Sequence, residues 1–303
     1  MRLRELSPGE LARRLHAGEL RLHTGPFVFR LQSPHREVQA GIQAMYAEHR
    51  LADPSEPADF ALQIVPGKGL HRVWHRQACF VFDDRAIFEP LPAAHAFALL
   101  EWSMNWCISS HAHQYLIVHA AVLARGDRAL LLPAPPGSGK STLCAALMLS
   151  GWRLLSDELT LVRMSDGWID PLVRPVSLKN RSIGVIDARF PAARFSAVTR
   201  DTSKGDVAHL QPPADAVAAM NMRARARWIV QPRWQADAPL QLTRRPRASA
   251  AVELARNAFN FALQGQEGFE LVADLVTACD CHDLVYGNLD EALAHFEALA
   301  AAP

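Results

Sequence analysis

The segment APPGSGKST, at residues 134–142, combines two glycines, a lysine and hydroxyl side chains at a spacing suited to binding phosphate. It fits the pattern GxxxxGK(S/T), except that Ala134 replaces the first glycine. In such a loop the backbone N–H groups and a helix N-terminus point at one anion, the lysine neutralises the β and γ phosphates, and the serine hydroxyl binds Mg²⁺. We therefore predict that Mg-ATP is held by Pro136, Gly137, Ser138, Gly139, Lys140, Ser141 and Thr142.

The elements around this loop favour the same interpretation. An apolar strand over residues 129–132 ends directly before the loop, and an apolar helix without glycine or proline, over residues 142–149, begins directly after it. The alternative is an ordinary strand-to-helix turn. Gly151 then ends the helix, and a strand over residues 153–156 delivers Asp157 and Glu158 at its end, beside the loop.

A carboxylate in that position can hold Mg²⁺ or accept the proton of an attacking hydroxyl, and two adjacent acids permit both. The alternative for Asp157 and Glu158 is a solvated strand end.

The string HAAVLARGDRALLLPAPPGSGKSTLCAALMLSGWRLLSDE resembles the catalytic core of the HPr kinase/phosphorylase family, especially its HPr-kinase-related branch. That family has a histidine on the strand before the phosphate loop, a loop ending in GKS, a helix, a glycine-containing turn, and a strand ending in two acids. The matching residues are His119, the segment 139–141, Gly151, Asp157 and Glu158. The resemblance covers about residues 114–303.

The resemblance implies that Asp157 activates the acceptor hydroxyl and that His119 approaches the transferred phosphate. Lys140, which the loop motif places against the β and γ phosphates, is the third catalytic residue that we predict. Metal binding falls to Ser141 and Glu158, although Glu158 departs from the aspartate usual in the family. Without the resemblance, His119 is a core histidine on an apolar strand.

Two further segments look like counterparts of the related branch. They are Lys179 with Asn180, in PVSLKN, and Lys204 with Gly205, in DTSKGDVAHL. Ordinary turn chemistry explains these loop positions equally well.

The fold class we predict is α/β: a P-loop kinase domain of the HPr-kinase type over residues 113–303, with a smaller N-terminal α+β domain over residues 1–112. Within the N-terminal domain we expect strands at residues 26–32, 60–65 and 78–82 and a helix near residues 35–49. A longer helix after Pro92 has an apolar face broadened by Trp102 and Trp106, which we interpret as packing that docks the two domains together.

Further elements follow the acid pair. We expect a hairpin over residues 156–173, a strand at 226–230, one helix over 248–263, a strand at 281–286 and a closing helix over 288–300.

Composition excludes several function classes. Lysine and arginine (32) nearly balance aspartate and glutamate (31), so no overall positive field exists to hold nucleic acid or an anionic membrane. The charged start and the absence of a long apolar run predict a cytoplasmic protein. Five scattered cysteines do not form a disulfide framework. The CDCHD segment at residues 279–283 could suggest a metal, but its spacing favours a buried strand.

The alternating arginines at residues 223–227 would share one face of a strand. They could bind an acidic or phosphorylated partner, or they could be the charged residues of an edge strand that resists aggregation. The same two readings apply to the arginines at residues 244–247.

These observations together predict an ATP-dependent kinase that acts on a serine or another hydroxyl of a protein or peptide, using ATP and Mg²⁺. A small-molecule kinase and a P-loop ATPase or nucleotide switch are the alternatives. The predicted partner is the protein or peptide substrate, with no nucleic acid and no membrane, and a homo-oligomer is left open.

Overall fold

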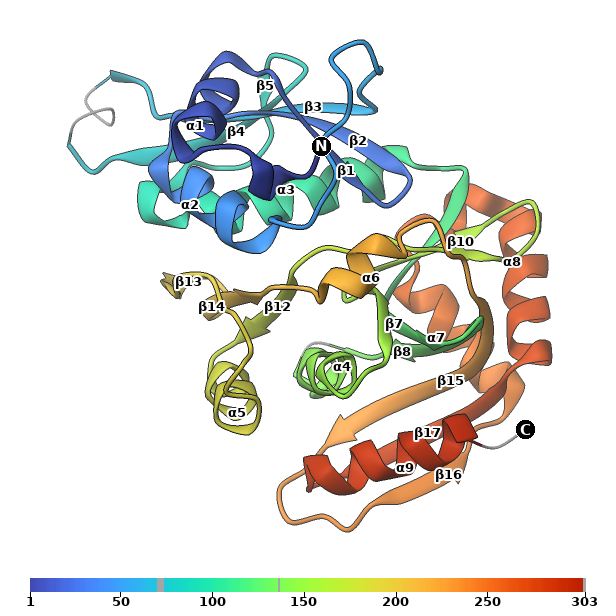
Figure 1. Ribbon diagram of the computed structural model, residues 1–303. Helices are drawn as coiled ribbons and strands as arrows, with labels where there is room; N and C mark the ends of the chain where they lie inside the picture. The colour runs from blue at the N-terminus through green and yellow to red at the C-terminus, as the bar shows by residue number, and fades with distance from the viewer. Residues whose placement is uncertain (70–73, 136, 302–303) are drawn as a thin grey trace.

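The computed structural model describes residues 1–69, 74–135 and 137–301. It has a mixed α/β fold with three sheets, in which the N-terminal third lies above the larger remainder of the chain in Figure 1. None of the helices in these three ranges is long and apolar enough to cross a membrane.

The N-terminal sheet has the strand order β1-β2-β3-β4-β5, with β6 paired to β4. Its strands are β1 (Leu20–Thr24), β2 (Phe27–Gln32), β3 (Phe60–Pro66), β4 (Gln77–Phe82), β5 (Arg85–Ala86) and β6 (Leu91–Pro92). The helices of this part are η1 (Leu3–Glu5), α1 (Pro8–Ala17), α2 (Arg36–Met45), η3 (Ala93–His95) and α3 (Ala96–His111). The strands predicted at 26–32, 60–65 and 78–82 and the two predicted helices are thereby confirmed.

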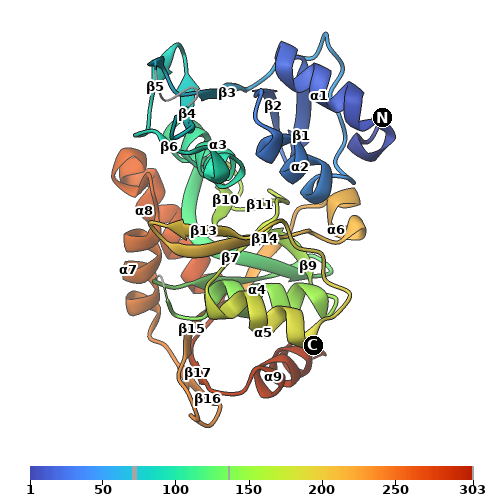
Figure 2. The same cartoon turned by 90° about the vertical axis from the view of Figure 1, so that its left-hand side faces the viewer.

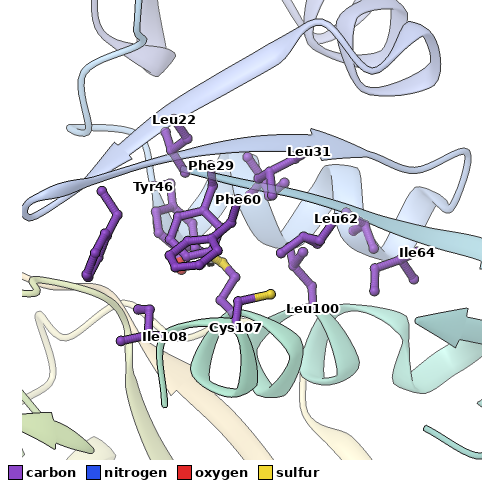
Figure 3. Close-up of a cluster of buried hydrophobic side chains, with 14 of the residues drawn as sticks. Leu22, Phe29, Leu31, Tyr46, Phe60, Leu62, Ile64, Leu100, Cys107 and Ile108 are labelled. Carbon is purple, nitrogen blue, oxygen red and sulfur yellow. Dashed lines mark hydrogen bonds between the residues drawn. The ribbon is translucent and has the colours of Figure 1, made fainter. Parts of the chain in front are cut away.

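The core of this N-terminal part continues into the rest of the chain. Phe29, Phe60 and Leu100 pack in a cluster of buried side chains, drawn in Figure 3. The same cluster includes Ile117 and Leu161, which lie beyond residue 112. The predicted boundary falls between the end of α3 at His111 and the next strand, but the apolar contacts cross it.

The largest sheet has the strand order β11-β10-β7-β8-β15-β17-β16, with β9 paired to β7. Its strands are β7 (Tyr115–Arg125), β8 (Arg128–Pro133), β9 (Arg153–Ser156), β10 (Leu159–Arg163), β11 (Ile169–Asp170), β15 (Arg225–Trp234), β16 (Gln241–Arg244) and β17 (Asp280–Tyr286). The central strands β8, β15 and β17 run parallel. The predicted hairpin and the strands at 153–156, 226–230 and 281–286 are confirmed. Most of the CDCHD segment lies in β17, where the two cysteines are buried and Asp280 is exposed.

Side chains alternate along a strand, and β7 has apolar side chains on both faces of this sheet. Helices cover both faces. Ala121 and Leu123 of β7 pack with α4 (Lys140–Leu149) and α9 (Leu289–Ala301) on one face. Ala120 and Val122 pack on the other face with α7 (Arg247–Asn257) and α8 (Phe261–Ala278). The helices predicted after the phosphate loop and at the end of the chain are therefore present.

The prediction of one helix over 248–263 is wrong. The chain leaves helical geometry between α7 and α8, where Phe259 N–H donates to the carbonyl of Ile117 at 2.9 Å. The Asn260 side chain accepts from Ile117 N–H at 3.0 Å and donates to Tyr115 O at 2.8 Å. These bonds to β7 replace helical ones, and α8 then extends to Ala278.

A small third sheet, in the order β12-β14-β13, lies beside α4 and α5 in Figure 2. It consists of β12 (Val176–Lys179), β14 (Gly205–Leu210) and β13 (Thr199–Thr202), and the nearby helices are α5 (Arg181–Arg189) and α6 (Ala214–Ala218).

The edge-strand interpretation of the arginines at 223–227 is also wrong, because β15 lies between β8 and β17. Arg223 pairs with Asp170 at 2.6 Å, and Arg227 pairs with Asp280 at 2.9 Å. The second group, at 244–247, begins at the end of β16, which is an edge strand of its sheet.

Candidate active site

The predicted phosphate loop connects β8 to α4 and is anchored on the ends of two neighbouring strands. Gly137 and Gly139 have φ angles of 84° and 88°, which L side chains rarely adopt. A Cβ on Gly139 would lie 2.8 Å from the Tyr286 hydroxyl and 2.9 Å from Trp234 Cβ, so only glycine fits there. Trp234 N–H donates to Ser138 O at 2.8 Å, which fixes the loop on β15. Pro136 lies outside the described residues.

The N-terminus of α4 follows this loop and presents unpaired donors. No side chain caps the helix, whose N-cap is Gly139. Within the described ranges, no acceptor is bonded to the N–H groups of Ser141 and Thr142. The first N–H groups of a helix carry a partial positive charge, so this end of α4 is suited to an anion.

Lys140 and His119 form a pair behind the loop. The lysine is 7% exposed, and its Nζ lies 3.0 Å from His119 Nε2. Burial, reinforced by the charge of Lys140, lowers the pKa of His119 to about 4. The imidazole is therefore neutral and accepts from the ammonium. Lys140 has no carboxylate within salt-bridge distance in the described part of the chain, so its charge is available to a phosphate.

Asp157 stands next to the serine of the loop. Its Oδ2 accepts from Ser141 Oγ at 3.3 Å and from Ser177 N–H at 3.1 Å, while its Oδ1 is buried with no hydrogen-bond partner in the structure. Burial, together with the charge of Glu158, raises the pKa of this carboxyl to about 6, although Lys140 opposes the shift. The side chain can thus exchange a proton near neutral pH.

Glu158 occupies a different environment and stays ionised. Burial opposes its charge, but Lys179, Lys204 and Lys140 outweigh burial and lower the pKa of Glu158. Asn105 donates a hydrogen bond to its Oε2. The adjacent acids therefore have pKa values pushed in opposite directions, the arrangement found where two carboxyls take different roles.

The small sheet brings its two lysines to this acid pair. Lys179 ends β12, and Lys204 lies in the turn between β13 and β14, with its Nζ 4.9 Å from the centre of the Trp102 ring. Asn180 has a turn role instead: at a φ of 51°, its Oδ1 accepts from Asp206 N–H at 3.0 Å.

Sequence reasoning missed the wall of the site that α3 provides. A cavity beside Asp157 and Glu158 is lined in part by Glu101 and Asn105. Arg174 donates to Glu101 Oε2 at 2.6 Å and to Asn105 Oδ1 at 2.5 Å. A signal was present in the sequence, since Glu101 and Asn105, at a helical spacing of four, interrupt the largely apolar segment AFALLEWSMNWCI.

The structure thus brings His119, Lys140, Ser141 and Asp157 into direct contact in pairs. Glu158 follows Asp157 in the chain but is bonded to Asn105, and no hydrogen bond joins it to Ser141 in the described residues. The metal role predicted for Glu158 stays a prediction.

Comparison with known proteins finds similar solved structures but no match in sequence. No protein-family model matches the sequence, and no curated protein matches it. Solved structures similar to this chain include the Hpr(Ser) kinase/phosphatase from Coxiella burnetii, with 11% sequence identity and a TM-score of 0.25. The match covers 60% of this chain and 96% of that one. A TM-score this low does not bear on what the present chain binds or does.

Proposed function

We propose that the chain is an ATP-dependent kinase that phosphorylates a serine or another hydroxyl of a protein or peptide. The observation that carries the proposal is the position of Asp157, a buried carboxyl with a pKa of about 6, at 3.3 Å from the serine of a phosphate-binding loop. A carboxyl that merely ended a strand in water would have neither the burial nor the raised pKa.

The residues of the loop fit a nucleoside triphosphate. Ser138 Oγ and Asp157 Oδ1 are buried polar atoms without partners in the structure, which is costly unless a ligand satisfies them. Gly137 leaves the loop backbone open to close approach, since a Cβ there would meet nothing within 4 Å, and Lys140 supplies a cation. We assign the phosphates of ATP to this loop and to the first turn of α4.

Ser141 and Glu158 are the residues that we expect to hold Mg²⁺. When bound, Mg²⁺ neutralises charge on the phosphate oxygens. Asp157 touches Ser141 through Oδ2 and leaves Oδ1 for the acceptor.

In the proposed reaction, Asp157 Oδ1 takes the proton of the acceptor hydroxyl. The hydroxyl oxygen forms a bond to the γ phosphorus while the bond from that phosphorus to the ADP oxygen breaks. Lys140 balances negative charge on the phosphoryl group, and neutral His119 holds the ammonium in place through Nε2. Lys179 and Lys204 lower the pKa of Glu158 and so keep it ionised.

The experiment that tests the proposal is incubation of the protein with γ-labelled ATP, Mg²⁺ and lysate of the source cell, followed by mass spectrometry. We expect a new phosphoserine, or another phosphorylated hydroxyl, on a polypeptide. The Asp157→Asn variant is the matched control, because it keeps the shape of the side chain but cannot accept the proton. Label that appears equally with this variant comes from another kinase in the lysate.

An ATPase or nucleotide switch gives the opposite pattern. Such a protein releases phosphate from ATP in buffer at the same rate with or without lysate. Rapid ATP hydrolysis with no labelled acceptor would therefore replace the kinase proposal by the switch.

A further inference from the structure

A cavity opens between α3 of the N-terminal part and the acid pair. The lining includes Glu101, Trp102 and Asn105 of α3, and Asp157, Ser177 and His209 of the remainder. Residues more than 100 positions apart thus form one polar cavity. Among the described residues, none of the phosphate loop lines this cavity.

Three groups at this cavity are buried polar atoms without partners. His209 is 1% exposed, and neither of its ring nitrogens has a hydrogen-bond partner in the structure. The same holds for Ser177 Oγ and for Asp157 Oδ1. Buried polar groups are nearly always satisfied, because an unmet donor or acceptor costs about 1–3 kcal/mol. Three such groups around one cavity leave hydrogen-bonding positions that a bound hydroxyl can occupy.

Strand pairing places two of these groups side by side. Ser177 of β12 and His209 of β14 are direct partners in the antiparallel register, so their side chains project from the same face of the small sheet. The backbone N–H of His209 donates to Ser196 Oγ at 3.0 Å, and its ring lies edge-on to Phe97. The imidazole therefore has a fixed position in the wall of the cavity.

Asp157 connects this cavity to the phosphate loop. Ser141, on the side of the loop, and Ser177, on the side of the cavity, both donate to Asp157 Oδ2. A hydroxyl in the cavity would lie beside Asp157, whose Oδ1 has no other hydrogen-bond partner in the structure and can take its proton.

We infer that the acceptor hydroxyl binds in this cavity, hydrogen-bonded by His209 and Ser177, and that α3 forms one of its walls. The inference rests on the proposed kinase function and names the binding site of its substrate. It also gives the N-terminal part a role, because a chain without α3 lacks Glu101, Trp102 and Asn105 in that wall.

The charges at the cavity favour a neutral hydroxyl group over an anion. Arg174 lies in the lining, but its guanidinium is paired with Glu101 at 2.6 Å and cannot serve a second carboxylate. Burial lowers the pKa of His209, so the ring is neutral and offers one donor and one acceptor. A serine side chain, which both donates and accepts, matches these groups.

The test uses the full chain with ¹⁵N-labelled histidines and two small probes, N-acetylserinamide and N-acetylalaninamide, which differ by one hydroxyl. The His209 ring signals are assigned from their loss in His209→Gln and are followed with and without a non-hydrolysable ATP analogue and Mg²⁺. We expect the serine probe to shift these signals and the alanine probe to leave them unmoved. No shift with the serine probe, or equal shifts with both, overturns the inference.

Phosphate transfer from Mg-ATP to N-acetylserinamide gives the second readout. His209→Leu should lower the rate at least about tenfold, and His209→Gln, which keeps a donor and an acceptor, should stay within about threefold of the original chain. The dissociation constant of Mg-ATP should change less than about twofold in both. If His209→Leu does not fold, Ser177→Ala replaces it in this assay, with an expected loss of about fivefold in the transfer rate.

The two proposals fail in different ways. If the chain binds no Mg-ATP, the kinase proposal is wrong, whatever the His209 signals do. If Mg-ATP binds and the serine probe is phosphorylated at an undiminished rate by His209→Leu, the kinase stands and the acceptor binds elsewhere.

Discussion

The pH dependence of phosphoryl transfer follows from the environment of Asp157. This carboxyl acts as a base only when ionised, and its pKa is raised to about 6 by burial. With that value, about 9% of the groups are ionised at pH 5 and about 91% at pH 7. The value of kcat/KM should therefore rise about tenfold between these pH values. An aspartate with the usual pKa of 3.8 would be about 94% ionised already at pH 5, and the profile would be flat.

The assay is the initial rate of phosphate transfer at limiting acceptor and saturating Mg-ATP, from pH 5 to pH 8. Asp157→Asn should lower the rate about a hundredfold or more and abolish the rising limb, with the affinity for ATP changed by less than about threefold. Glu158→Gln is the matched control: it should keep a rising limb but move it to lower pH, because the charge of Glu158 raises the pKa of Asp157. A flat profile in the original chain, or full activity in Asp157→Asn, would refute this assignment of the base.

Three other changes have expected outcomes. Lys140→Ala removes the buried cation of the loop and should weaken Mg-ATP binding at least about tenfold by calorimetry; unchanged affinity in the folded variant contradicts the phosphate-loop assignment. Ser141→Ala should weaken ATP binding more in Mg²⁺ than in EDTA, whereas equal losses mean that Ser141 does not touch the ion. Arg174→Met leaves Glu101 buried without its partner and should lower the free energy of unfolding by about 3–5 kcal/mol in urea, against less than about 1 kcal/mol for the exposed control Arg189→Met.

The strand and helix around the predicted phosphate loop, and the strand that ends before Asp157 and Glu158, could be predicted from sequence because their signals are local. A strand, a glycine-rich turn and a helix follow one another without interruption, and the register of a few residues fixes where Lys140, Ser141 and Asp157 stand. The same holds for the strands of the N-terminal part, whose apolar runs are short and bounded by turns.

The rest of the site depends on contacts between distant segments, which periodicity does not reveal. Asn105 meets Glu158 across 53 positions, and Arg174 meets Glu101 across 73. His209 looks like one more residue of a strand until its pairing with Ser177 is known. The break between α7 and α8 was missed for the same reason: Asn260 bonds the backbone of β7, more than 140 positions earlier.

The apolar cluster that includes Phe29, Phe60, Ile117 and Leu161 couples the unfolding of the N-terminal third to that of the rest of the chain. Deleting the first 112 residues would uncover these apolar side chains of β7 and β10 and strip Arg174 of its counter-charge at once. Exposure of that surface favours aggregation over autonomous folding. Thermal denaturation of the whole chain should then give one cooperative transition. Because the apolar cluster is shared, the N-terminal third could be replaced in evolution only together with the faces of β7 and β10 that it covers.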